Sequence, residues 1–102
     1  MKKGIEIDRI RMTVPTKMVL KIFLGADSKA KFYGALLSAE TGLSAGTLSH
    51  ILRRLEYEGW LMGKLEDAKI AEQENRPRRR YYRMTSFGRK QAKEKGIGDG
   101  QG

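Results

Sequence analysis

The chain has 102 residues, of which 39% are hydrophobic and 32% charged, and its formal net charge is +9. This length and composition fit one small globular domain with a single modest core. The chain has no cysteine and one histidine, His50, which excludes disulfides, thiolate zinc sites, cysteine nucleophiles and histidine metal clusters, and no cofactor is expected. No apolar run approaches the roughly 20 residues of a membrane-spanning helix.

The first 13 residues are predicted to form a basic arm. Apolar residues alternate with charged ones in it, which is the period of a β-strand. Because the segment is too short to stand alone, we expect it to lie against the body or against a partner subunit, with a frayed tail as the alternative. Its charges stand where a signal peptide has its apolar region, so a cytoplasmic protein without membrane contact is expected.

A first helix is predicted from Pro15 to about Gly25, because proline suits a first helical turn, where its missing N–H is not needed. A cap is expected at residue 13 or 14. Leu20 and Leu24 form a second apolar stripe beside the main apolar face of this helix. That stripe is interpreted either as a dimer surface or as ordinary core packing beneath the arm.

The next segment has the pattern of two helices joined by a turn. After a short strand at about residues 30–32, a helix is predicted from Tyr33 to about Glu40, ended at Gly42, because glycine tolerates the left-handed conformation. A longer helix is predicted over about residues 44–58. Ser44 fits its N-cap, and its apolar residues recur at helical spacing on one stripe, namely Leu48, Ile51, Leu52 and Leu55.

The opposite face of the longer helix carries hydroxyl, imidazole, guanidinium and phenol groups. These groups contact phosphates and base edges in a major groove, so the segment is a candidate helix-turn-helix with residues 44–58 as the recognition helix. The alternative for Arg53 and Arg54 is an ion pair with Glu56 or Glu58. Arginine ahead of glutamate is the weaker order for such pairs.

Two strands are predicted after this helix, at about residues 60–67 and 79–84, with a loop of mixed charge over 68–77. In the second strand Tyr82 and Met84 share a face with Arg80, whereas Tyr81 and Arg83 lie on the other face with Arg79. We call residues 60–84 the wing, because a hairpin with a basic tip directly follows a helix-turn-helix. A last helix is predicted from the cap residue 85 to about residue 95, and a disordered tail over 96–102.

The positive charge is concentrated near the C-terminus. Residues 71–102 contain nine basic and four acidic side chains, and five of the arginines fall within positions 76–83. A basic excess of this density indicates a polyanionic partner, most often nucleic acid. The alternative is a solvated run of charges.

Several of these segments together resemble the PadR-type winged-helix transcriptional regulators. The resemblance covers about residues 12–92, in order and at the spacing of that family. It is carried by Tyr33-Gly34, the segment from Gly42 to Leu48, Arg53-Arg54-Leu55-Glu56, Gly59-Trp60-Leu61, the segment from Arg76 to Thr85, and Gly88.

The resemblance implies a mainly α protein with a small β-hairpin (α+β), a winged helix-turn-helix over residues 14–95. It further implies a DNA-binding repressor, usually a homodimer on a palindromic operator, with the recognition helix in the major groove. The basic wing segment 76–83 would reach the minor groove or the backbone. By position, the residues implied to contact double-stranded DNA are Ser44, Thr47, Ser49, His50, Arg53 and Arg54 on the helix, and Arg76, Arg78, Arg79 and Arg83 on the wing.

The sequence departs from the family pattern at three places. Leu36 and the pair Ser49-His50 replace residues that are common in the family, and the contacts of Ser49-His50 are expected to differ. The long C-terminal helices of most members are replaced by one short helix, so dimerisation would depend on the arm and the first helix. This departure argues against small-molecule sensing.

Two other kinds of function fit the same sequence. A winged helix also serves as a protein-interaction module inside larger assemblies, or as an RNA-binding domain. An enzyme is not expected, because no nucleophile–base pair, carboxylate dyad or metal-binding spacing is present.

Overall fold

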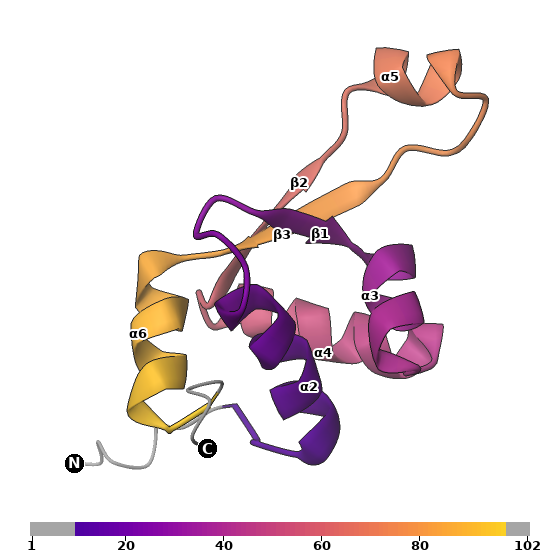
Figure 1. Cartoon of the computed structure of the whole chain (residues 1–102). Helices are drawn as coiled ribbons and strands as arrows, with labels where there is room; N and C mark the ends of the chain where they lie inside the picture. The colour runs from indigo at the N-terminus through magenta and orange to yellow at the C-terminus, as the bar shows by residue number, and fades with distance from the viewer. Residues whose placement is uncertain (1–9, 98–102) are drawn as a thin grey trace.

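The computed structural model describes residues 10–97 of the chain. Most of its helices pack on one side of a small sheet, and the hairpin projects away from this body with a short helix at its tip (Figure 1). The elements follow in the order α2 (Val14–Leu24), β1 (Lys31–Tyr33), α3 (Gly34–Thr41), α4 (Ala45–Tyr57), β2 (Leu61–Leu65), α5 (Ala68–Gln73), β3 (Arg80–Met84) and α6 (Ser86–Glu94). The predicted fold class, an α+β winged helix-turn-helix, is confirmed.

Side-chain caps begin three of the helices where the sequence predicts them. Thr13 accepts a hydrogen bond from the backbone N–H of the first turn of α2, Ser44 does so for α4, and Thr85 for α6. Each cap satisfies an N–H that would otherwise lack a partner at a helix start. Gly42 ends α3 in the left-handed region, with φ of 78°, which only glycine adopts without strain.

The sheet is antiparallel, with strand order β1–β3–β2. β3 is therefore the central strand, and its residues pair with both neighbours; Arg83, for example, lies opposite Lys31 on one side and Met62 on the other. Tyr82 and Met84 are buried toward the helices, whereas Arg83 between them is exposed. This alternation confirms the two faces predicted for the strand.

The wing contains a short helix that the sequence analysis missed. Residues 68–77 were predicted as a loop, but Ala68–Gln73 form α5. Asp67 caps it by accepting a hydrogen bond from the Lys69 N–H, at 2.9 Å, and the residues that follow are mostly good helix formers. With six residues, the helix is too short for an apolar period to reveal it.

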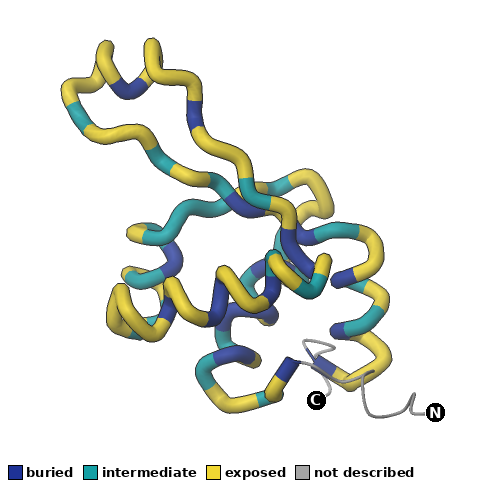
Figure 2. Tube along the Cα trace, turned by 180° about the vertical axis from the view of Figure 1, so that it is seen from behind, coloured by how far each residue is buried: buried dark blue, intermediate teal, exposed yellow. Residues whose placement is uncertain are grey.

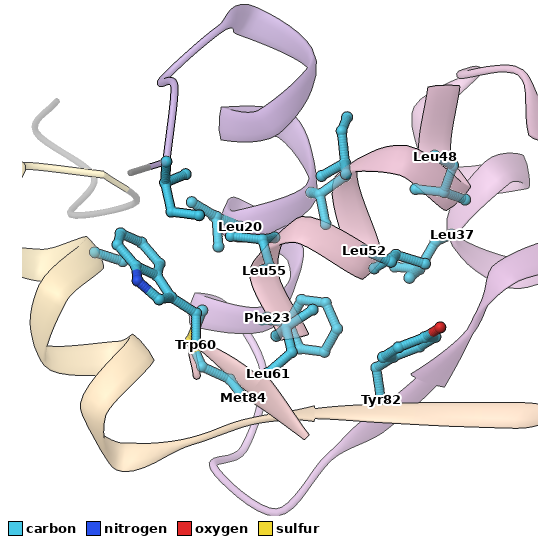
Figure 3. Close-up of a cluster of buried hydrophobic side chains, with 14 of the residues drawn as sticks. Leu20, Phe23, Leu37, Leu48, Leu52, Leu55, Trp60, Leu61, Tyr82 and Met84 are labelled. Carbon is cyan, nitrogen blue, oxygen red and sulfur yellow. The ribbon is translucent and has the colours of Figure 1, made fainter. Parts of the chain in front are cut away.

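The core lies between the helices and the inner face of the sheet (Figure 3). Trp60 is 5% exposed and belongs to this core. Leu20 is fully buried in this core. The interpretation of Leu20 as part of a dimer surface is therefore wrong, because the domain itself covers this side chain. Leu24 is half-buried against the same cluster.

Residues near both ends of the described chain belong to the core. Ile10 and Ile97 are each 4% exposed, although the predicted domain limits of 14–95 leave both outside. The remainder of the predicted arm and tail, residues 1–9 and 98–102, lies outside the described residues, and the division into arm, domain and tail stays a prediction. The wing, in contrast to the body, is exposed along most of its length (Figure 2).

Across residues 10–97, no helix combines the length and the hydrophobicity needed to cross a bilayer. The same residues hold no cluster of three or more His, Cys, Asp or Glu side chains placed to bind a metal ion.

Candidate nucleic-acid interface

The outward face of α4 presents every residue that the sequence predicted for it. Six side chains are exposed, namely Ser44, Thr47, Ser49, His50, Arg53 and Arg54. Four leucine and isoleucine residues on the other face are buried in the core. The amphipathic period thus fixes the rotation of the helix and turns this polar face to solvent.

The start of α4 is held by two hydroxyl groups. The Ser44 hydroxyl accepts the Thr47 N–H at 3.2 Å and lies 3.1 Å from the Thr47 hydroxyl. Both side chains are exposed at the positive end of the helix dipole. This end is therefore suited to an anionic ligand such as a phosphate.

The polar face of α4 has two flanks that border different grooves. Ser49 lines a groove of about 510 Å³ formed with α3 and β3. Thr47, His50 and Arg54 line another groove, of about 860 Å³, beside the start of α2. At 100° per residue, Arg53 falls between the two flanks, so it occupies the crest of the exposed face.

Arg54 forms an ion pair with Glu58, with 3.6 Å between Nη1 and the carboxylate oxygen. The Arg54 side chain is 50% exposed, so solvent screens the pair and its strength is low. The alternative of pairing within the helix is thus realised for Arg54. Among residues 10–97, no ion pair involves Arg53.

An ion pair attaches the wing to the recognition helix α4. Nη2 of Arg80 lies 2.7 Å from Oε2 of Glu56, and the neighbouring carboxylate raises the pKa of Arg80. Gly63 of β2 makes room for this pair, because a Cβ at position 63 would lie 2.9 Å from both Arg80 Nε and Glu56 Oε2. Arg80 thus has the structural role that its place on the Tyr82 face suggests.

The tip of the wing is organised around a buried carboxylate. Glu66 is 8% exposed, and its carboxylate accepts hydrogen bonds from both terminal nitrogens of Arg76, at 2.7 and 2.9 Å. The Arg79 backbone N–H donates to the same carboxylate at 3.1 Å. The hydrogen bonds from Arg76 are the main cause that lowers the pKa of Glu66 to about 2.

Arg76 is turned into the wing rather than toward a partner. Its Nε donates to Glu74 at 2.8 Å, its terminal nitrogens donate to Glu66, and its side chain is only 17% exposed. Hydrogen bonds to the two carboxylates raise the pKa of this guanidinium. The structure therefore argues against direct DNA contact by Arg76, because its donors already bind oxygens of the wing.

Arg78 and Arg79 lie at the mouth of a groove between the wing and the start of α3. The groove has a volume of about 360 Å³ and is bordered on the α3 side by Gly34 and Ala35. Arg78 is exposed and donates its Nε to the Glu66 carbonyl at 2.8 Å. The Arg79 guanidinium stacks on the Tyr33 ring, 4.0 Å from its centroid, which fixes its position.

Arg83 lies apart from Arg78, but it lines a groove of about 820 Å³ on the outer side of the wing together with Arg76 and Arg79. It is exposed on the sheet face that points away from the core and from α4, and its Nη2 lies 3.4 Å from the Met62 sulfur. The register Lys31↔Arg83 places it at the base of the sheet. Strand alternation turns the Arg83 side chain to the sheet face away from α4, and its contact with DNA stays a prediction.

The groove beside Ser49 and the groove beside Arg78 meet. Both are lined by Gly34, Ala35 and Arg80, so one concave surface runs from α4 across the start of α3 to the wing. Sequence reasoning did not assign the α3 residues to the site. They are small and uncharged, and only the shared lining of the two grooves reveals their place.

The geometry thus combines an exposed polar helix, a basic hairpin and a concave surface that joins them. Comparison with known protein families matches residues 30–94, more than half of the chain, to the transcriptional regulator PadR-like family. Comparison with curated proteins found no match, and neither did comparison with solved structures. The matched segment contains β1, the helix-turn-helix, the wing and α6. The chain belongs to the PadR-like family of transcriptional regulators.

Proposed function

We propose that this regulator is a sequence-specific repressor that binds a palindromic DNA operator as a homodimer. In this proposal α4 enters the major groove, and the wing lies on the neighbouring minor groove or backbone. Repression follows from occlusion of the operator. The observation that carries the proposal is the single concave surface from Ser49 to Arg78, which joins helix and wing across Gly34, Ala35 and Arg80.

The polar groups on this concave surface and on the exposed face of α4 beside it divide into two roles. Ser49, His50 and Arg53 are exposed on the helix and carry groups that hydrogen bond to base edges in the major groove. Arg78 and the capped start of α4 carry phosphate contacts, which fix register but do not discriminate sequence. Ser44, Thr47, Arg54 and Arg79 complete the proposed DNA-contacting set at the ends and flanks.

In this proposal the wing is held in place by Arg76, Arg80 and Glu56, which make no base contacts of their own. Their ion pairs hold the wing at its tip and at the tip-side end of its strands, where Arg80 lies opposite Leu65. Fixing the hairpin before DNA arrives reduces the ordering entropy that binding must overcome. The hairpin thereby acts as a pre-ordered second contact.

Selection of bound duplexes from a random library tests the proposal. A two-fold symmetric consensus, with half-sites about one helical turn apart, is the expected result and reports sequence preference and dimerisation together. A consensus without symmetry would refute the homodimer on a palindrome. Salt-sensitive binding without any consensus would refute sequence-specific repression and favour the protein-interaction module.

A further inference from the structure

A second basic groove lies at the end of the sheet where α6 begins. It has a volume of about 680 Å³ and is formed by three segments: the connection between α2 and β1, the end of β3, and one side of α6. Its lining residues are Ser28, Lys29, Arg83, Met84, Ser86, Arg89, Lys90, Lys93 and Glu94.

The charge of this groove is strongly unbalanced. Five cationic side chains line it against one carboxylate, that of Glu94. Of the five, only Arg89 is half-buried, with its Nη2 placed 3.4 Å from the Phe23 carbonyl oxygen. Within the described part of the chain, none of the five forms an ion pair. The groove therefore concentrates positive potential that the fold itself does not neutralise.

This groove shares no lining residue with the grooves beside α4 or with the groove at Arg78, although Arg83 and Met84 at the base of the wing contribute to it. Arg83 points away from the core, whereas Tyr82 and Met84 beside it point toward α4 and its neighbours. Figure 1 shows α6 at one end of the sheet and α3 at the other. None of its lining residues also lines the grooves beside α4, which contain Ser49 and His50.

We propose that the α6 groove binds the phosphate backbone of a second DNA duplex segment. A protomer bound through α4 and the wing would then hold another segment of DNA and bridge the two. Lysine and arginine side chains spread over three segments match a line of phosphates. Cations outnumber the two hydroxyls of the groove, those of Ser28 and Ser86, and no amide side chain lines it, so the contact that we propose is with phosphates and independent of sequence. The proposal goes beyond operator recognition and rests on different residues.

A bridging assay tests it. One duplex is immobilised on beads and saturated with the full-length protein, and after washing a fluorescent duplex of random sequence is added. The wild type is expected to capture the second duplex. Lys90→Glu combined with Lys93→Glu should load on the first duplex equally but capture the second at least about tenfold less, because two phosphate contacts become repulsive.

The matched control is Lys17→Glu with Lys21→Glu, which makes the same charge change on exposed positions of α2. This control is expected to capture the second duplex as the wild type does. If it loses capture equally, net charge rather than the groove is responsible, and the proposal is overturned. If the protein has no operator preference, the same assay is run with random-sequence DNA on the beads. The operator proposal can therefore fail without the bridging proposal failing, and the reverse also holds.

Three further outcomes would also overturn the proposal. The first is no capture by the wild type. The second is undiminished capture by the α6 variant, which would mean that two recognition faces of an oligomer bridge the DNA. The third is capture of an RNA hairpin but not of a DNA duplex. If the glutamate variant does not fold, Lys93→Cys replaces it. The chain has no native cysteine, so a photocrosslinker placed there is unique, and it must crosslink the second duplex.

Discussion

Arg80 on the central strand and Glu56 near the end of α4 lie 2.7 Å apart and connect the wing to the recognition helix. The two side chains are 44% and 31% exposed, so solvent screens their attraction and the pair stabilises the fold by about 1 kcal/mol at most. We infer that the main role of the pair is to orient the wing relative to α4. It sets the angle between two surfaces that must fit one duplex together.

Glu56→Gln should lower the preference for the operator without lowering the affinity for DNA in general. The substitution removes a negative charge near DNA, so affinity for random duplexes is expected to rise slightly, while the preference for the selected operator falls about tenfold as the wing loses its attachment. The ratio of the two dissociation constants measures this. Glu40→Gln, at an exposed position of α3, is the control and should keep the preference. Unchanged preference in Glu56→Gln would remove the orienting role.

Arg53→Ala should lower discrimination between operator and random DNA, because Arg53 occupies the crest of the exposed face of α4. Loss of one arginine–base contact typically costs about 1–3 kcal/mol of specificity. Competition binding with single-base operator variants measures the loss. Equal weakening on operator and random DNA would instead identify Arg53 as a backbone contact.

Arg78→Ala and Arg76→Ala should weaken binding for different reasons. Loss of the exposed Arg78 should reduce affinity for all sequences and lower the slope of log K against log salt by about one, with the wing otherwise unchanged. Loss of Arg76 leaves the buried Glu66 carboxylate without its main partner and should open the wing. Hydrogen exchange of the wing amides distinguishes the two. Slow exchange in both variants would contradict the bracing role of Arg76.

The stability of the wing should depend on pH through Glu66. Its pKa in the folded protein is about 2, below the ordinary value of 4.5, so the stabilisation is complete above about 4.5 and is lost as the pH falls toward 2. The expected observation is a falling protection factor of the Arg79 amide over this range, after correction for the pH dependence of intrinsic exchange. Glu66→Gln should flatten the dependence, whereas Glu72→Gln on the exposed side of α5 should preserve it.

Gly88→Ala should be strongly destabilising. A Cβ at this position of α6 would lie 2.2 Å from the Trp60 carbonyl oxygen, so the helix must move from the core at a cost of about 3 kcal/mol. Urea unfolding measures the change. Gly46→Ala in α4 is the control, because a Cβ there meets no atom within 4 Å and should stabilise the protein by up to about 1 kcal/mol. Equal stability of the two variants would refute the close packing of α6 on Trp60.

The amino-acid sequence alone determined the helix-turn-helix, the capped starts of α2, α4 and α6, and the paired strands of the wing. The signals for these features are local. A hydroxyl three residues ahead of an N–H, a glycine at a helix end, and apolar periods of 3.6 or 2 each act within a few neighbouring positions. The same signals turned the six polar residues of α4 to solvent.

The tertiary structure alone decided what each wing arginine does. In sequence Arg76, Arg78 and Arg83 are equivalent members of one basic run, but folding buries the carboxylate of Glu66 and so draws Arg76 inward, because a buried charge must be paired. Strand pairing places Arg83 on the far face of the sheet, and Arg78 is left beside α3. Which charges meet depends on the strand register and on residues that are distant in the sequence. A run of like charges gives no information about either.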